Sequence, residues 1–141
     1  MSRLKFYSKE ITISTERLYQ LIDITREVER IVAESGIKNG LCLVYAPHAT
    51  AAIIANEHES GLMEDILKSI KKLYPRGAGW RHDLIDDNAA AHLGSAFIGA
   101  DRVFPVINGR LVRGTWQNIF LVEMDGPRYK RRVLICVLGI E

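Results

Sequence analysis

The stretch RVFPVINGRLVRGTWQNIFLVEMDGPRYKRRVLICVL, residues 102–138, decides the fold of this chain. Its apolar and β-branched residues gather in short runs between turn residues, which is typical of antiparallel strands. We expect strands at 102–107, from Arg110, at 117–124 and at 129–138. The pair Asn108-Gly109 favours a type I′ hairpin turn, and residues 125–128 suit a second turn. The C-terminal third is therefore predicted to be antiparallel sheet.

Upstream of this stretch, strand patterns alternate with helical ones. Strands are expected at 4–14, 18–24, 41–45 and 51–55. Helices are expected after Thr25, after Ser60 and after Asn88, each of which is a candidate N-terminal cap. In the last helix, Ala89, Leu93 and Phe97 are expected to face the core. The predicted fold class is α+β, a mainly antiparallel β-sheet sandwich with about three helices.

Composition predicts one domain over residues 1–141, because 141 residues of which 48% are hydrophobic can bury a core without disulfides or metal staples. Cys42 and Cys136 stand alone in apolar runs, which indicates a reducing compartment and a cytoplasmic protein. No run approaches the roughly 20 apolar residues of a membrane span. Nineteen basic against seventeen acidic residues give no argument for a nucleic-acid partner.

The histidines are the first candidates for chemistry, since all four lie between residues 48 and 92. His48, His82 and His92 fall on three separate predicted elements. Three imidazoles with an open fourth position are typical of catalytic zinc sites, so these residues are candidate ligands of a divalent metal, zinc above all. The alternative is that they are surface or hydrogen-bonded core histidines. His58, which lies among acidic residues, is interpreted as a solvated turn histidine.

Polar residues at strand ends are the next candidates. Asn56 and Glu57 end a predicted strand, where they either pair with the backbone of the next turn or line a site. Thr115 and Gln117 offer a hydroxyl and an amide to a polar ligand, unless their segment is only a bulge beside a core tryptophan. Glu123 is expected to face inward, where its carboxylate needs a cation, a metal or several donors.

Motifs along nearly the whole chain resemble those of the YjbQ-like family, also called the secondary thiamine-phosphate synthase family. The matching stretches, in order, are His48-Ala-Thr50, Asn56-Glu57, Trp80-Arg-His82, Asn88-Ala-Ala-Ala-His92, Gly114-Thr-Trp-Gln117 and Asp125-Gly-Pro-Arg128. The chain differs from the family's usual motif at Ala49 and Thr50, and it has Trp80 where a tyrosine is frequent. These departures change the wall of the site and leave the candidate ligands in place.

The resemblance implies an α+β fold with an extensive antiparallel sheet, a homotrimer, and a pocket built around the histidines. It also implies a weak thiamine-phosphate synthase activity, in which a hydroxymethylpyrimidine diphosphate is joined to a thiazole phosphate. No nucleic acid or membrane partner is implied.

Our leading hypothesis is therefore a metal-dependent enzyme, a transferase acting on a small and phosphorylated substrate. His48, His82 and His92 would hold the metal, while Glu57 or Glu123 would orient a ligand, complete the shell or act as a general base. Asn56, Thr115 and Gln117 would contact the substrate, and Arg81, Arg110 or Arg113 could assist a diphosphate. The rival hypotheses are a metal-dependent hydrolase of a small metabolite and a trimeric protein that binds metal or ligand without turnover.

Overall fold

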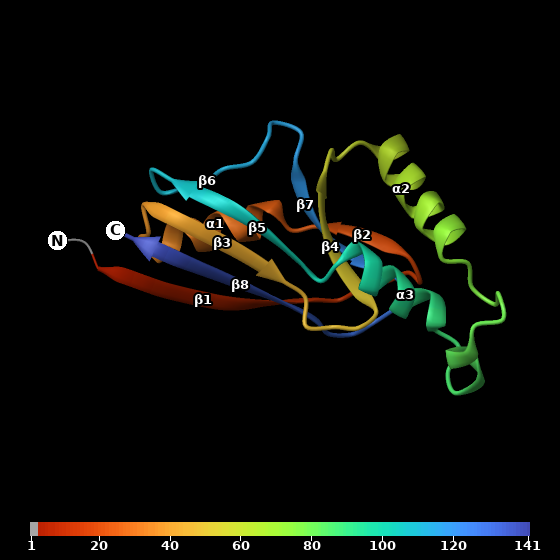
Figure 1. The fold of residues 1–141 in the computed structure, drawn as a ribbon. Coiled ribbons are helices and arrows are strands. Elements are labelled where there is room, and N and C mark those ends of the chain that lie inside the picture. The colour runs from red at the N-terminus through yellow and green to blue at the C-terminus, as the bar shows by residue number, and fades with distance from the viewer. Residues whose placement is uncertain (1–2) are drawn as a thin grey trace.

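Two antiparallel sheets organise the chain in the computed structural model, which describes residues 3–141 (Figure 1). The larger sheet has the strand order β1 (Leu4–Ile13), β8 (Arg131–Ile140), β3 (Asn39–Tyr45), β5 (Asp101–Ile107) and β6 (Arg110–Leu111). The smaller sheet has the order β2 (Gln20–Asp23), β7 (Asn118–Glu123) and β4 (Ala51–Asn56). The α+β prediction with a mainly antiparallel sheet is confirmed.

Three α-helices accompany the sheets in the described chain: α1 (Thr25–Ser35), α2 (Ser60–Leu73) and α3 (Ala89–Ile98), with a short 3-10 helix, η1 (Arg81–Leu84). The apolar face of α1 joins the core shared by the two sheets. A second core lies on the other face of the smaller sheet, beneath α2 and α3 (Figure 1). The smaller sheet is therefore buried on both faces, which explains why β7 is an almost unbroken apolar run.

The β5–β6 hairpin confirms the turn predicted at Asn108-Gly109. Both residues have positive φ, 52° and 77°, as a type I′ turn requires. Within residues 3–141, no helix is long and apolar enough to cross a membrane.

The predicted helix caps differ from those observed. Thr25 is the first helical residue of α1, and its backbone N–H donates to Oδ1 of Asp23 at 2.9 Å. In α2 the cap is Glu59 rather than Ser60, because the Glu59 carboxylate accepts from the N–H of Gly61 at 2.7 Å and of Leu62 at 2.8 Å. A carboxylate at this position also interacts favourably with the helix dipole.

Asn88 occupies the predicted cap position of α3 but uses its side chain elsewhere. Its Nδ2 donates to Asp125 Oδ2 at 2.9 Å, and Asp83 accepts from the first helical N–H, that of Ala89, at 3.0 Å. The inner face of α3 was also mispredicted, since Phe97 is 73% exposed. The helix packs through its small residues instead, because Met124 and Tyr74 approach it closely at Gly94.

A buried ion pair joins the two sheets. Glu123, at the end of β7, is fully buried, and Arg131, at the start of β8, is 4% exposed. Arg131 Nε lies 2.9 Å and Nη2 2.5 Å from Glu123 Oε2, while the Thr15 hydroxyl donates to Oε1 at 2.9 Å. Arg131 Nη2 also donates to Oγ1 and the carbonyl of Thr50, at 3.0 and 3.3 Å. The prediction that Glu123 faces inward and meets a cation is confirmed.

We expect Glu123→Gln to destabilise the protein by about 3–5 kcal/mol, because the substitution leaves the Arg131 charge buried without a counter-charge. The free energy of unfolding is measured by guanidinium denaturation followed by circular dichroism. Glu10→Gln is the matched control, since it removes the exposed pair of Glu10 with Arg132 and should cost at most about 1 kcal/mol. Equal midpoints for the two variants would contradict a structural role of the buried pair.

Candidate functional site

Two of the candidate histidines form a pair at the N-terminal end of α3. His82 belongs to η1 and His92 to α3, and their ring centroids lie 4.7 Å apart with the rings edge to face at 79°. The hydrogen bond between Asp83 and Ala89 N–H fixes η1 against this end of the helix. Two imidazoles from different elements are therefore held side by side, with His92 half-buried and His82 exposed.

Asn88 adds an unusual feature beside this pair. Asn88 is buried, and its Oδ1 atom receives no hydrogen bond from any donor in the described chain. Buried acceptors of this kind are rare and require an explanation, such as a water or an ion. Asn88 precedes His92 by four residues, so one helix end presents both the pair of rings and a free acceptor.

His48 lies in the connection between β3 and β4, and its ring makes a hydrogen bond to the main chain at the start of β8. Nε2 accepts the N–H of Arg132 at 2.8 Å, so the neutral ring carries its proton on Nδ1. Burial lowers the pKa of His48 below 6.5, and the charge of Arg131 lowers it further. The carbonyl of His48 also accepts from Ser95 Oγ on α3, at 3.4 Å.

The three candidate ligands do not meet in one cluster. Within residues 3–141, no group of three or more His, Cys, Asp or Glu side chains is placed to hold a metal ion. His82 and His92 come together, whereas the Nε2 lone pair of His48 is used by Arg132. The expected cluster of three histidines is therefore not formed. His82 and His92 make a pair, and His48 is a separate neutral ring.

His58, interpreted from the sequence as a solvated turn residue, is exposed in the connection before α2 and also pairs with a carboxylate. Its ring is half-exposed, and its Nδ1 lies 2.6 Å from Asp23 Oδ2. Burial raises the pKa of Asp23, but hydrogen bonds from His58, Thr25 and Asn118 outweigh it and lower the pKa to about 2. Asp23 lies 35 residues from His58, so no local spacing could have revealed this pair.

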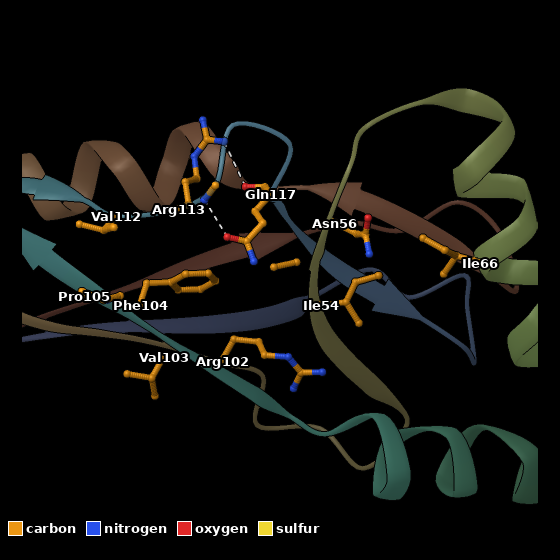
Figure 2. Close-up of a pocket in the computed structure, with 12 residues that line it drawn as sticks. Ile54, Asn56, Ile66, Arg102, Val103, Phe104, Pro105, Val112, Arg113 and Gln117 are labelled. Carbon is orange, nitrogen blue, oxygen red and sulfur yellow. Dashed lines mark hydrogen bonds between the residues drawn. The ribbon is translucent and has the colours of Figure 1, made fainter.

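The strand-end residues contribute to a cavity of about 830 Å³ between β4 and β5, called here the β4–β5 cavity (Figure 2). Asn56 and Gln117 both line it, as do apolar side chains that include Ile54 and Phe104. Asn56 also accepts the N–H of Glu57 at 2.8 Å, so it pairs with the backbone while it lines the cavity. Gln117 accepts the N–H of Gly114 through Oε1 at 2.7 Å, which leaves its amide nitrogen free to donate.

The other candidates lie outside this cavity. Thr115 is exposed in the loop before β7, and Glu57 is half-buried where β4 ends. Glu123 is held by Arg131 and Thr15.

Two arginines, Arg102 and Arg113, line the β4–β5 cavity. Arg102 was not identified from the sequence, because nothing in its local pattern separates it from other strand arginines.

Comparisons with known proteins agree with this fold along its length. A family model described as UPF0047 protein, YjbQ-like, matches residues 9–140. A UPF0047 protein of Archaeoglobus fulgidus is 48% identical over 129 residues, covering 92% of this chain and 99% of the relative. The crystal structure of a YbjQ-like protein of unknown function from Sulfolobus solfataricus is 60% identical, with a TM-score of 0.96 and coverage of 97% and 99%. That of a hypothetical protein from Aeropyrum pernix is 50% identical, with a TM-score of 0.91 and coverage of 94% and 98%.

We expect His48 to titrate below pH 6.5 and to carry its proton on Nδ1 when neutral. Because its pKa is lower in the folded than in the unfolded state, protonation favours unfolding, and stability should fall as the pH drops below about 6.5. Long-range ¹H–¹⁵N spectra of the ring measure both the tautomer and the pKa. A proton on Nε2 would contradict the hydrogen bond to Arg132, and a pKa at or above 6.5 would contradict the burial of the ring beside Arg131.

Proposed function

The chain belongs to the UPF0047 family of YjbQ-like proteins, and on that premise we propose that it is a metal-binding enzyme acting on a small phosphorylated metabolite. The observation that carries the proposal is the His82–His92 pair, whose ring centroids lie 4.7 Å apart at the same end of α3 as Asn88, which has a buried oxygen without a donor. The proposed reaction is a thiamine-phosphate synthase-type transfer. It joins a hydroxymethylpyrimidine diphosphate to a thiazole phosphate and releases diphosphate.

The proposed cofactor is a divalent metal, zinc above all, because imidazole nitrogens are its common ligands. His82 and His92 supply two ligands, and the third is His48, once its ring gives up the Arg132 N–H, or a group from another copy of the chain. When bound, such a metal would neutralise charge on a diphosphate leaving group. His48 favours this role because its lowered pKa keeps the ring neutral at pH 7.

The chain's other candidate residues have separate roles in the proposal. Glu57 is the carboxylate proposed to move a proton, since it is half-buried and follows Asn56 directly. Glu123 is proposed to position His48 indirectly. It pairs with Arg131, and the next residue, Arg132, donates its backbone N–H to the His48 ring. Asn56 and Gln117 are proposed to bind substrate in the β4–β5 cavity, with Thr115 at the adjoining loop.

The proposal includes a homotrimer, whose contacts we assign to the outer face of the larger sheet. A row of apolar residues crosses four strands in register there: Phe6, Leu138, Leu41 and Pro105. Phe6 is 62% and Leu41 53% exposed in the single chain. An uncovered apolar face of this extent is typical of protein interfaces rather than of monomer surfaces.

We expect near-stoichiometric zinc or another transition metal in the purified protein, and its loss in the variant with His48, His82 and His92 all changed to alanine. Elemental analysis measures the metal, and circular dichroism verifies that the variant folds. His58→Ala is the matched control and should retain metal, because His58 pairs with Asp23 instead. A wild-type protein that stays metal-free after incubation with zinc, manganese or nickel would refute the metal site.

Product analysis tests the reaction and separates it from the two rivals. Incubation of the metal-loaded protein with both phosphorylated substrates should yield thiamine phosphate and diphosphate, and Glu57→Gln should reduce the rate by about 100-fold. Hydrolysis of either substrate without joining would indicate the hydrolase. Binding without any product would indicate a ligand-binding protein.

We expect Leu138→Lys to dissociate the trimer, because it places a charge in the middle of the apolar row. Light scattering coupled to size-exclusion chromatography measures the mass. Leu84→Lys is the control, since Leu84 is 89% exposed in η1, away from the larger sheet, and should leave the assembly intact. A monomeric wild-type protein at micromolar concentration would contradict the proposed trimer.

A further inference from the structure

A separate cavity of about 570 Å³ lies between the segment that precedes β2 and the C-terminal end of α2. We call it the Tyr19 cavity, and its lining residues are Arg17, Leu18, Tyr19, Leu67, Lys71 and Arg76. Three of these are cationic and none is acidic. A neighbouring cavity that shares Arg17 and Leu67 contains Glu64. The surplus of positive charge therefore belongs to the Tyr19 cavity, and it favours an anionic ligand.

Two of the cations lie over one aromatic ring. Lys71 Nζ is 5.1 Å and Arg76 Cζ 6.0 Å from the centroid of the Tyr19 ring, and both are attracted to its π-electrons. Tyr19 is 8% exposed and belongs to the core beneath α2 and α3, so the ring is a fixed support. The two like charges also repel each other, and a bound anion would offset that repulsion.

Arg76 is oriented mainly by neutral groups. Its Nη2 donates to the Asp87 carbonyl at 3.0 Å, and its Nη1 donates to the Met124 carbonyl at 3.4 Å. Asp125 Oδ1 lies 3.9 Å from Nη2, while Oδ2 of the same carboxylate accepts from Arg128 at 2.6 Å. The guanidinium is therefore held in place, and its charge is only weakly compensated.

The other two cations have no acidic partner. Within residues 3–141, neither Arg17 nor Lys71 forms an ion pair, and both are exposed. Lys71 lies in the last turn of α2, where a cation interacts favourably with the helix dipole. That explanation applies equally to Lys72, which lies outside the cavity lining, and it does not apply to Arg17, which comes from another segment. The helix dipole alone therefore does not account for the three cations.

The apolar part of the lining indicates the body of the ligand. The Tyr19 ring is buried and has cations over it, so it offers no free face on which an aromatic ligand could stack. Leu18 and Leu67 remain, and both are aliphatic. The volume falls within the range of about 300–1,000 Å³ that is usual for sites of small molecules. The cavity therefore suits a short aliphatic frame that carries more than one acidic group.

We propose that the Tyr19 cavity binds a small aliphatic polycarboxylate, and that Arg17, Lys71 and Arg76 contact its carboxylates. The three cations come from the segment before β2, from α2 and from the loop after α2. Cations distributed in this way match carboxylates that are spread along a frame, whereas a phosphate group concentrates its charge at one point. The site contains none of the residues assigned to the metal or to the substrate, so it goes beyond the proposed function.

The test uses tricarballylate as the probe and isothermal titration calorimetry of the full chain at neutral pH and low ionic strength. Metal is first removed with phenanthroline, because EDTA is itself a polycarboxylate. We expect saturable binding of tricarballylate, and binding of the monocarboxylate butyrate weaker by about 10-fold or more. Arg17→Gln, Lys71→Gln and Arg76→Gln should each weaken tricarballylate by about 5-fold or more. Thermal unfolding verifies the fold, and the exposed Arg17 and Lys71 keep the test valid if Arg76→Gln is unstable.

Lys72→Gln is the matched control, because it removes the same charge from the same turn of α2 outside the cavity lining, and its affinity should stay within about twofold of wild type. Equal losses in Lys71→Gln and Lys72→Gln would overturn the proposal, since net charge alone would then explain the binding. Tricarballylate that fails to bind the wild type at about 10 mM would overturn it as well. Inorganic diphosphate that binds about 10-fold tighter than tricarballylate would overturn the assignment to carboxylates.

Discussion

The buried pair of Glu123 with Arg131 is the interaction on which the arrangement of the rest depends. A buried carboxylate is stable only with a matched counter-charge and with hydrogen-bond donors to its oxygens. The pair therefore fixes the start of β8 relative to the end of β7. The next residue, Arg132, then directs its N–H at His48, and the His48 carbonyl accepts from Ser95 on α3. Through this chain of contacts one ion pair sets the position of the smaller sheet, of His48 and of α3.

The burial of the smaller sheet on both faces explains where the candidate functional residues lie. The interior of β7 carries apolar side chains toward two cores, so polar groups are confined to the strand ends and the adjoining loops. Asn56 ends β4, and Gln117 immediately precedes β7. Where β4 diverges from β5 of the larger sheet, these ends border the β4–β5 cavity.

Local patterns in the sequence were sufficient for most elements and for some site residues. Asn108-Gly109 specifies its own turn, and the alternation around Glu123 shows which way that side chain points, because both signals depend on near neighbours. Glu59 displaced Ser60 as a cap because a carboxylate can accept two N–H groups at once. The packing of α3 through Gly94, with Phe97 outside, depends on the close approach of Met124, and the His58–Asp23 pair spans 35 residues. Contacts of this kind are set by the fold, so periodicity could not reveal them.

The hydrogen bond between His48 and Arg132 looks at first like an obstacle to metal binding, because the Nε2 lone pair serves only one partner at a time. The free energies of the hydrogen bond and of metal binding show that it is not an obstacle. A neutral hydrogen bond contributes about 1 kcal/mol net, and the one from Arg132 to His48 is exposed, so water can take the place of the ring. Occupation of a zinc site contributes about 10 kcal/mol or more in small folded domains. His48 can therefore leave the main chain at small cost, and the hydrogen bond serves to hold the ring in one tautomer and close to α3.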